Sequence, residues 1–460
     1  MNYDLLSPLF GMAWKLPAWA EVPREMALAL VFTFVFLALL LILGSIPLSY
    51  NLRNLLTRWR TTLLTALAFT LVISLQTVML GFVNGMYQLT DQSGQPGNVM
   101  VLSDGALDEL VSNLGFSDTA DVDRHPLVVR DEHDQPLASR EVYVVVNQPL
   151  PTVPGVQQKR RFTQIRGIED PVIAARVHGL ELYPDGAWFS ASGVQALPGA
   201  ADDTKEQAIQ AVLGEGVAGQ LGNDRGKERL EIGDVFDLGP RKWIVTGIMR
   251  SAGSTFGSEV WSKRGLVGPM FGKESYSSIV LRTADAKTAR EVSDDLTKNF
   301  KKAAVQAQPE TVYFSKLSET NRQFSAAIVF LAIVMAVGGV FGVMNTMFAA
   351  ISGRTKDIAM LRIVGFARWQ ILVSFFLESL AISLFGGLLG CALGFLTNGW
   401  TATSIVSGGQ GGGGKFVVLE LVIGADTLLA GLLLALAMGA IGGLLPAISA
   451  MRLKPLESLR

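Results

Sequence analysis

Few side chains in this sequence have the types and spacing that catalysis or metal binding requires. The three histidines, His125, His133 and His178, follow no ligand spacing, and Cys391 is the single cysteine. Cys391 therefore excludes a cysteine metal site and an intrachain disulfide, and its apolar surroundings favour a small core residue. Serine, aspartate and histidine occur without a motif that would assemble a nucleophile and a base. We expect no catalytic residue and no metal ligand.

One segment resembles a nucleotide-binding loop. Gly409 to Lys415 reads G-Q-G-G-G-G-K, which fits the first seven positions of a phosphate-binding P-loop. Phe416 then replaces the serine or threonine whose hydroxyl would hold magnesium, and no parallel strand precedes the segment. A flexible linker between helices is favoured. If ATP drives this protein, another chain must bind it.

Long uncharged runs indicate a membrane protein. The chain is 49% hydrophobic and 17% charged, and Lys plus Arg number 39 against 40 for Asp plus Glu, so no charge excess points to nucleic acid. A helix needs about 20 apolar residues to cross the hydrocarbon core. Five runs are long enough and predict an α-helical transmembrane bundle. They are Met26 to Ile46, Thr61 to Tyr87, Gln323 to Gly353, Trp369 to about Thr397, and Thr427 to Met451.

Basic residues predict the orientation of these runs. Lysine and arginine collect in short cytoplasmic loops beside membrane spans. Here they follow the first, third and fifth runs: Arg53, Arg58 and Arg60; Arg354, Lys356, Arg362 and Arg368; and Arg452, Lys454 and Arg460. The N-terminus, residues 88–322 and the glycine-rich loop are then extracytoplasmic. We expect a multi-pass protein of the bacterial cytoplasmic (inner) membrane.

Residues 88–322 have the pattern of a large α/β domain inserted between the second and third spans. Turn residues such as Gly233 and Gly239 separate short β-like runs. The strands are expected at Glu141 to Val146, Lys242 to Ile248 and Ser278 to Arg282, and helices at Lys205 to Leu213 and Ala286 to Phe300. A segment of this length holds one large or two small domains, and two subdomains are preferred.

The stretch Gly342 to Glu378 closely resembles the region between the second and third helices of MacB/FtsX/LolC-type ABC permeases. The matching positions are Asn345-Thr346-Met347, Arg354-Thr355, Ile358, Arg362, Gly365 and Glu378, whereas Asp357, Ala359 and Phe366 replace the family's usual Glu, Gly and Ala. Residues 51–64 resemble the amphipathic entry to the family's first helix, and residues 446–460 resemble its C-terminal signature. The family usually has four helices, so the first run here is an addition.

This resemblance implies four segments. Residues 1–48 hold the additional helix, residues 49–87 the entry and first family helix, residues 88–322 a MacB-like periplasmic domain, and residues 323–460 an FtsX-like domain with three spans.

The resemblance also implies a short coupling helix that docks on an ATPase subunit, in the loop between the third and fourth runs. Its residues are Arg354, Thr355, Lys356, Asp357, Ile358, Ala359, Met360, Leu361, Arg362 and Gly365. Ile358, Met360, Leu361 and Ile363 are expected to make apolar contacts, and Arg354, Lys356 and Arg362 to donate to carboxylates of the partner. The alternative is an ordinary positive-inside loop, which explains the basic residues but not the interleaved apolar ones.

Two further features lie inside the apolar runs. Asn345 and Glu378 are polar; Glu378 is costly in hydrocarbon, so either a functional role or a structural hydrogen bond to a neighbouring helix is expected. Glycines recur at four-residue spacing, which permits close helix approach. They are Gly338 and Gly342; Gly386, Gly390 and Gly394; and Gly439 and Gly443.

The resemblance implies the permease subunit of an ABC transporter. It would transmit the movement of a separate ATPase, which binds ATP and Mg²⁺, to the periplasmic domain for export or extraction of a substrate. The partners expected are that ATPase, a second permease copy, membrane lipid, and a periplasmic adaptor or substrate protein. Release of lipoproteins or lipids within the same family, and a membrane receptor or scaffold without an ATPase, are the alternatives.

Overall fold

Four long apolar helices are present in the part of the chain that the structure describes. The computed structural model describes residues 57, 59–117, 119–149, 160–197, 207–251, 253–317, 319–406 and 415–453. Within these residues the helices long and apolar enough to cross a membrane are Thr62–Thr90, Ser325–Ser352, Arg368–Phe395 and Ala425–Arg452. They correspond to the last four predicted runs. The first run, Met26 to Ile46, lies outside the described residues, so a total of five spans stays a prediction.

The chain divides into two compact units. A helical unit contains the described residues up to Asn84 together with Ser325–Trp400 and the described residues from Leu421 onward. An α/β unit contains Gly85–Phe324 and Thr401–Glu420. Helices α3 (Trp59–Asp91) and α9 (Glu319–Ser352) each continue without interruption from one unit into the other.

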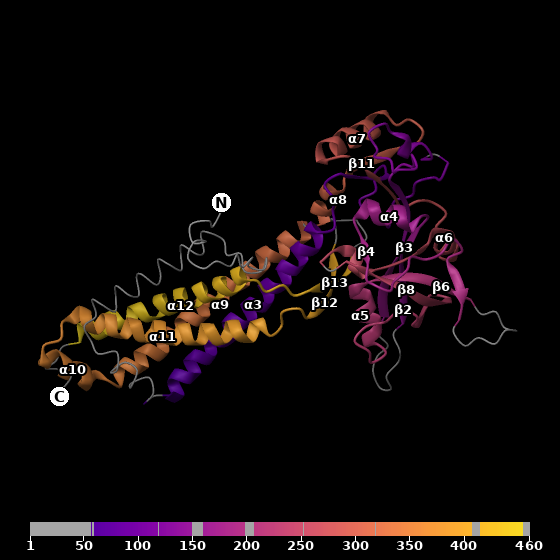
Figure 1. The fold of residues 1–460 in the computed structure, drawn as a ribbon. Helices are drawn as coiled ribbons and strands as arrows, with labels where there is room; N and C mark the ends of the chain where they lie inside the picture. The colour runs from indigo at the N-terminus through magenta and orange to yellow at the C-terminus, as the bar shows by residue number, and fades with distance from the viewer. Residues whose placement is uncertain are drawn as a thin grey trace, which may run out of the picture. The chain divides into compact units, whose positions relative to one another are not determined.

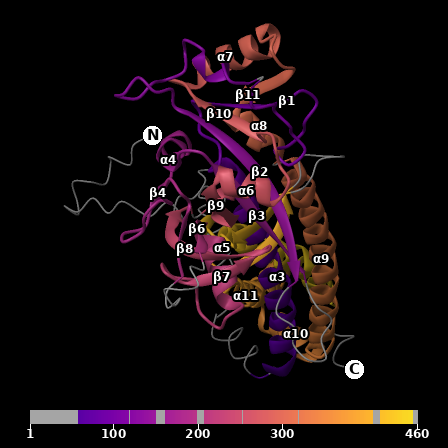
Figure 2. The same ribbon diagram turned by 90° about the vertical axis from the view of Figure 1, so that its right-hand side faces the viewer.

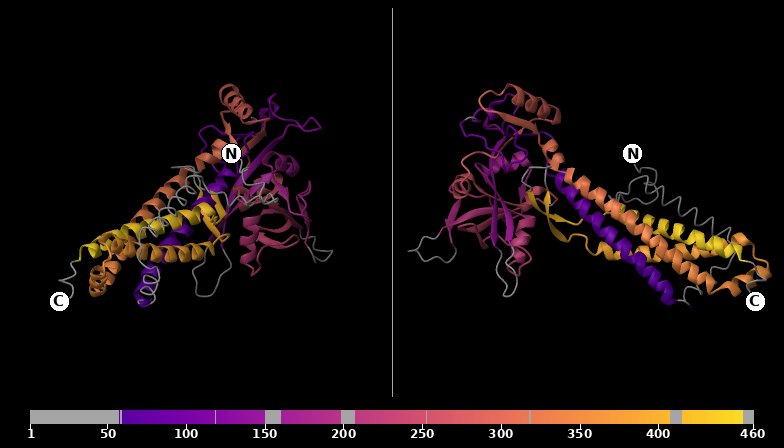
Figure 3. Two further views of the ribbon diagram at one scale, coloured as in Figure 1. Left: turned by 60° about the vertical axis from the view of Figure 1, so that its left-hand side comes forward. Right: turned by 180° about the vertical axis from the view of Figure 1, so that it is seen from behind.

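The helical unit is a bundle of α3, α9, α11 (Arg368–Phe395) and α12 (Ala425–Arg452), with the short helix α10 (Thr355–Val364) between α9 and α11 in the chain (Figures 1 and 3). Glycines allow the helices of this bundle to approach closely. A Cβ atom on Gly390 of α11 would lie 2.8 Å from the Cβ of Ile73 on α3.

The other glycine pairs divide into packed and open positions. Gly439 and Gly443 of α12 face Ser383 and Ser379 of α11, whereas no described atom lies within 4 Å of a Cβ on Gly338 or Gly342. Close helix approach at the glycines is therefore confirmed for the α11 and α12 series, whereas Gly338 and Gly342 of α9 make no such contact within the described residues.

The α/β unit contains one sheet of 11 strands in the order β11-β1-β10-β2-β3-β9-β6-β8-β4, to which β5 and β7 add at β6 and β8. In Figure 2 the long strands β2 and β3 run side by side. The strands are β1 (Asn98–Ser103), β2 (Ala138–Pro149), β3 (Arg160–Ile168), β4 (Glu181–Leu182), β5 (Val194–Ala196), β6 (Gln207–Gly214), β7 (Val235–Leu238), β8 (Arg241–Arg250), β9 (Glu259–Lys263), β10 (Ser278–Arg282) and β11 (Val305–Pro309).

Helices connect these strands and cover the sheet. They are η2 (Val122–Arg124), α4 (Pro171–His178), α5 (Glu215–Asn223), η3 (Thr255–Ser258), α6 (Arg264–Met270), α7 (Ala286–Asn299) and α8 (Glu310–Leu317). The predicted strands lie within β2, β8 and β10, and the predicted helix from Ala286 corresponds to α7. Gly233 and Gly239 have positive φ angles of 91° and 62°, as their predicted turns require.

The helix predicted at Lys205 to Leu213 is wrong. Residues 207–214 form β6, which pairs with β8 and β9. Its central residues are almost all buried. A strand buried on both faces has a nearly continuous apolar sequence, without the alternation that would distinguish it from a buried helix.

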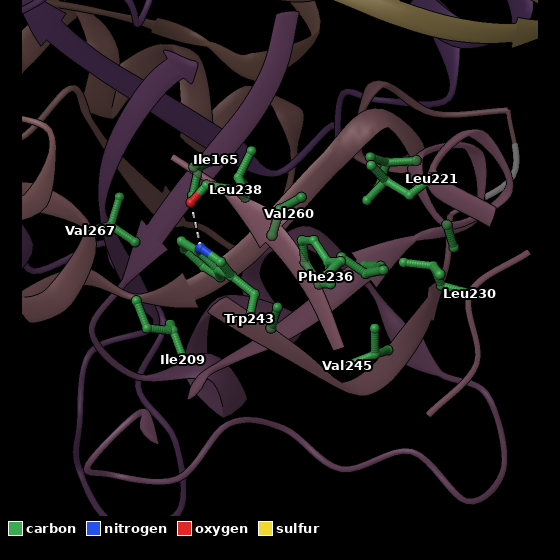
Figure 4. Packing of buried hydrophobic residues seen from close by; sticks show 14 of the residues in the cluster. Ile165, Ile209, Leu221, Leu230, Phe236, Leu238, Trp243, Val245, Val260 and Val267 are labelled. Carbon is green, nitrogen blue, oxygen red and sulfur yellow. Dashed lines mark hydrogen bonds between the residues drawn. The ribbon is translucent and has the colours of Figure 1, made fainter. Parts of the chain in front are cut away.

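Two hydrophobic cores lie on this one sheet. The first joins β1, β10, β11 and α7. The second joins β3, β6, β8, β9 and α5, and Figure 4 shows it around Trp243 and Phe236. The indole Nε1 of Trp243 donates to the carbonyl of Leu238 at 2.8 Å, so the one polar atom of this side chain is paired inside the core.

A hairpin occupies the chain between α11 and α12. Strands β12 (Thr401–Val406) and β13 (Lys415–Glu420) are antiparallel and belong to the α/β unit, where the Val418 amide donates to Ser258 Oγ at 2.7 Å. The predicted linker thus lies between two paired strands, and its last residue, Lys415, begins β13. Residues 407–414, which hold most of the glycine run, lie outside the described residues.

Candidate functional site

The segment between α9 and α11 folds as the short helix that the resemblance implies. Arg354 is the N-cap of α10, and the amide of Ile358 donates to its carbonyl at 2.9 Å. Gly365 ends the helix with a φ of 112°, in the left-handed region that glycine adopts without strain. Gly365 therefore gives the end of α10 a clear sequence signal, whereas Arg354 makes no side-chain capping bond at its start.

Arg354 and Glu378 form a buried bidentate ion pair. Nη1 and Nη2 of Arg354 donate to Oε2 and Oε1 of Glu378 at 2.9 and 3.1 Å. Only 5% of Arg354 and 4% of Glu378 is exposed, and the ring of Phe375 lies 5.9 Å from the Arg354 guanidinium carbon. Two parallel charge-assisted bonds fix the start of α10 to the middle of α11.

This pair corrects one prediction about the loop. Arg354 was expected to donate to carboxylates of a partner protein, but its guanidinium group is buried and donates to Glu378 of the same chain. Glu378 makes the structural hydrogen bond that was one of its two expected roles. Its donor is Arg354 at the start of α10, and not a residue of a neighbouring membrane-spanning helix. Asn345 lies exposed on α9 and is not part of this buried pair.

One side of α10 packs into the helical unit. Ile358 and Ala359 are 1% and 2% exposed. Ile358 belongs to the same hydrophobic cluster as Ile351, Ile371 and Phe375. The prediction that Ile358 contacts a partner is therefore wrong, because its side chain is part of the chain's own core.

The opposite side of α10 is exposed and mainly apolar. Met360, Ile363 and Val364 are 58%, 60% and 74% exposed, and Lys356 precedes them on the same side because the spacing is i, i+4, i+7 and i+8. We call Lys356, Met360, Ile363 and Val364 the exposed α10 face. Val364 was not among the predicted residues, although it continues the same apolar pattern.

The remaining predicted residues lie at the edges of this face. Asp357 is exposed, whereas Thr355, Leu361 and Arg362 are half-buried. Arg362 Nη1 donates to the carbonyl of Phe366 at 3.0 Å, which ties the end of α10 to the turn before α11. An exposed cluster of large apolar side chains with charged neighbours is typical of a protein interaction surface.

A second group of charged side chains lies inside the α/β unit. Arg166 on β3 donates to Glu109, Glu141 and Glu259, and His178 on α4 pairs with Glu141 at 2.6 Å. We call these residues, with Glu310, the buried charge cluster; His178 Nδ1 lies 3.4 Å from Glu310. Their side chains are at most 1% exposed, so no substrate reaches them.

The electrostatics of this cluster keep His178 protonated. Burial lowers the pKa of His178, but the carboxylates of Glu141 and Glu310 outweigh burial and raise it to about 10. Burial raises the pKa of Glu141, and the charges of Arg166 and His178 outweigh burial and hold it well below its usual value. Sequence reasoning missed the cluster, because its members are scattered along the chain and follow no motif.

The residues that the structure describes contain no evident metal site. No group of three or more His, Cys, Asp or Glu side chains there could hold a metal ion. Cys391 is a buried free cysteine on α11. The exposed α10 face and the ion pair behind it are therefore the candidate functional site of the described chain.

Comparison with known proteins divides the chain into two matched regions. Residues 62–299 match the MacB-like periplasmic core domain, and residues 329–455 match the FtsX-like permease C-terminal domain. The first match alone covers more than half of the chain.

Individual relatives match this chain at low sequence identity. A macrolide export ATP-binding/permease protein MacB of Bdellovibrio bacteriovorus is 26% identical over 275 residues, which are 56% of this chain and 40% of that protein. An ABC transporter permease of Methanocaldococcus jannaschii is 29% identical over 255 residues, 54% of this chain and 61% of that protein. The chain thus spans about half the length of the relatives it matches.

Among solved structures, the periplasmic region of MacB from Actinobacillus actinomycetemcomitans aligns with 49% of this chain and 94% of its own, at 14% identity and a TM-score of 0.32. The extracellular domain of the transporter YknZ aligns with 46% of this chain and 99% of its own, at 16% identity and a TM-score of 0.30. Taken with the motifs around Arg354 and the four membrane helices, the two domain matches place this chain in the MacB/FtsX-type family of ABC transporter permeases.

Proposed function

We propose that the chain transmits ATP-driven movement of an ATPase subunit to its α/β domain, and that the exposed α10 face is where the ATPase binds. The observation that carries this proposal is the two-sided character of α10. One side is fixed in the helical unit by Ile358 and by the Arg354–Glu378 pair. The other side presents Met360, Ile363 and Val364 to solvent.

The chemistry of the exposed α10 face suits a groove on a folded partner. Burial of its three large apolar side chains supplies the main favourable free energy, at about 25 cal/mol for each Å² of apolar surface removed from water. Lys356 within the face and Asp357 at its edge offer charges of both signs, and exposed ion pairs of this kind add little affinity but select orientation. ATP and Mg²⁺ bind to the partner in this proposal.

The ion pair and the glycine contacts give the route of transmission. The bidentate bonds of Arg354 make α10 and the middle of α11 move together. Helix α11 packs closely on α3, where Gly386 and Gly390 meet Ala66 and Ile73. Because α3 continues to Asp91 in the α/β unit, a displacement of α10 reaches that unit through packed helices.

The substrate lies on the extracytoplasmic side in this proposal and is exported or extracted there. The active transporter contains a second copy of the permease, and membrane lipid surrounds its helices. The α/β domain binds an adaptor or a substrate protein.

Copurification from native membranes tests the proposal. The tagged chain should retain an ATPase, and Met360→Asp should lose it, because docking would bury an unpaired carboxylate at a cost of several kcal/mol. Met360→Leu, of similar volume and polarity, should retain the ATPase. If Met360→Asp keeps the ATPase at the native ratio, or if no ATPase copurifies with the native chain, the receptor or scaffold function becomes the better explanation.

A further inference from the structure

Three segments of chain connect the α/β unit to the membrane helices. The first follows α3, the second is α8, which precedes α9, and the third is the β12–β13 hairpin between α11 and α12. All three belong to the α/β unit, and within the described residues they are its covalent connections to the helical unit. A movement that passes along the chain from the helices therefore enters the α/β unit through these segments.

Glu310 binds two of these segments together. It begins α8 and is fully buried. Its Oε2 accepts from the backbone amide of Gln95, shortly after α3, at 2.9 Å, and from the side-chain amide of Asn98 at 2.8 Å. Asn98 begins β1, and the same amide donates to the carbonyl of Val177 on α4 at 2.9 Å. One carboxylate thus joins the segment after α3 to the segment before α9.

The other oxygen of this carboxylate faces the buried charge cluster. Glu310 Oε1 lies 3.4 Å from Nδ1 of His178, and Nε2 of His178 lies 2.6 Å from Glu141 on β2. Glu141 also accepts from Arg166 on β3, which donates to Glu259 on β9. The cluster therefore links α8 to three neighbouring strands through charges that interact strongly, because they are shielded from water.

The short helix η3 brings the hairpin to the same region. All four residues of η3 are buried. The amide of Thr255 donates to Ser93 Oγ, just after α3, at 2.8 Å. At the other end of η3, Ser258 Oγ accepts from the amide of Val418 on β13 at 2.7 Å. η3 thus contacts both the segment after α3 and the hairpin.

Phe256 connects η3 with the charge cluster and with α8. The centre of its ring lies 4.8 Å from the centre of the His178 ring and 6.4 Å from that of Phe314 on α8. The guanidinium carbon of Arg166 lies 5.5 Å from the same ring. All three connecting segments therefore meet at one buried region of the α/β unit.

We propose that Glu310 is the positioning residue of a joint in which the segment after α3, α8 and η3 are locked to the sheet. Buried ion pairs add little net stability compared with apolar packing, but removal of one partner is costly, so the segments that carry the charges are held in one arrangement. As a step in transmission this assignment rests on the proposed function. The joint itself is tested without ATP or an ATPase.

Glu310→Gln tests the joint because a carboxylate has two acceptor oxygens and a carboxamide has only one. The two oxygens of Glu310 face three donors: the amide of Gln95, the side-chain amide of Asn98 and the protonated ring of His178. The new NH₂ group would point at one or more of these donors. We therefore expect the joint to loosen in this variant.

Hydrogen exchange of the full-length chain in detergent, followed by mass spectrometry, measures this loosening. Residues 93–98 and 310–317 should exchange at least about tenfold faster in Glu310→Gln than in the native chain, the factor expected for loss of one charge-assisted hydrogen bond. Glu259→Gln is the matched control, since Glu259 is an equally buried carboxylate of the cluster that bonds to Arg166 and Trp261. It should lower the unfolding temperature without this local change.

Two results would overturn the joint: native exchange of both segments in Glu310→Gln, or an equal increase in Glu259→Gln. If Glu310→Gln does not fold, Phe314→Leu replaces it. This variant keeps every charge of the cluster and removes the ring contact between α8 and Phe256. Residues 310–317 should then exchange faster, and exchange at the native rate would contradict the joint.

A separate measurement tests the role of Glu310 in transmission. In the complex with the ATPase, ATP should change the exchange pattern of the native α/β domain, and this change should be lost in Glu310→Gln but kept in Glu259→Gln. A full ATP response in Glu310→Gln would overturn the positioning role. No ATP response in the native complex would instead overturn the proposed function, and the joint would still be judged by the exchange of its two segments without ATP.

Discussion

Arg354 and Glu378 show how a charged pair inside the helical unit serves as a fixed link. Arg354→Met should leave the Glu378 carboxylate buried without its main cation, which costs about 3–5 kcal/mol. The double variant Arg354→Met/Glu378→Met removes both charges, so it should unfold closer to the native temperature than either single variant. Thermal unfolding of purified protein in detergent measures this.

The outcome separates two roles of the pair. If the double variant recovers its stability but ATP no longer changes the α/β domain, the pair serves transmission as well as folding. A double variant that is less stable than Arg354→Met would contradict the assignment of Glu378 as the main partner of Arg354.

The buried charge cluster predicts a pH dependence of stability. The pKa of His178 is about 10 in the folded chain and about 6.5 in the unfolded chain. Its stabilising contribution is therefore complete below pH 6.5 and is lost as the pH rises through 10. Between these values the free energy of unfolding of the α/β domain should fall by about 1 kcal/mol per pH unit from this group.

The variant His178→Gln tests whether His178 causes this change of unfolding free energy with pH. Its free energy of unfolding should be lower than native at pH 6 and should change less between pH 7 and pH 9.5, as measured by urea titration. His133→Gln, at an exposed histidine, is the control and should keep the native slope. Equal slopes for native protein and His178→Gln would show that His178 is not charged in the folded state.

At the level of helices, we predict that the glycines of α11 are needed for its close packing against α3. Gly390→Val should destabilise the helical unit by at least about 1–3 kcal/mol, because the new Cβ would lie 2.8 Å from Ile73 Cβ and 2.9 Å from the Thr70 carbonyl. Gly338→Val on α9 is the matched control, since its Cβ meets no described atom. Thermal unfolding in detergent checks both, and a Gly390→Val variant as stable as Gly338→Val would contradict the close packing.

The elements also show what the sequence could and could not reveal. The helix at Ala286 was predictable because polar residues mark its exposed side, and the short helix after Arg354 because a family motif covers it. β6 was mistaken for a helix because both of its faces are buried, which removes the alternation of a strand. The β12–β13 hairpin was missed because the glycine run between its two strands was interpreted as a flexible linker.

The candidate site was only partly predictable, because sequence periodicity does not show which side of a helix packs against the rest of the chain. Periodicity does place apolar and basic residues on α10. Ile358 and Arg354 were therefore assigned to a partner although they pack inside, and Val364 was omitted although it is the most exposed apolar residue of the helix. The partner of Glu378 lies 24 residues away and required three-dimensional structure.

At the scale of the whole molecule, the chain combines membrane helices with a large α/β domain and spans about half the length of its relatives. Continuous helices α3 and α9 join the two units. The central proposal is that ATP-driven movement of a partner enters the chain through the exposed α10 face and reaches the α/β domain through these helices.

Photo-cross-linking at Val364 tests that claim most directly. A photoreactive amino acid at Val364, the most exposed apolar residue of the α10 face at 74%, should capture an ATPase subunit in native membranes, identified by mass spectrometry. The same amino acid at Phe330, 65% exposed on α9 near the predicted extracytoplasmic side, should capture lipid or another protein but no ATPase. Capture of no ATPase at Val364, or equal capture at Phe330, would contradict the account.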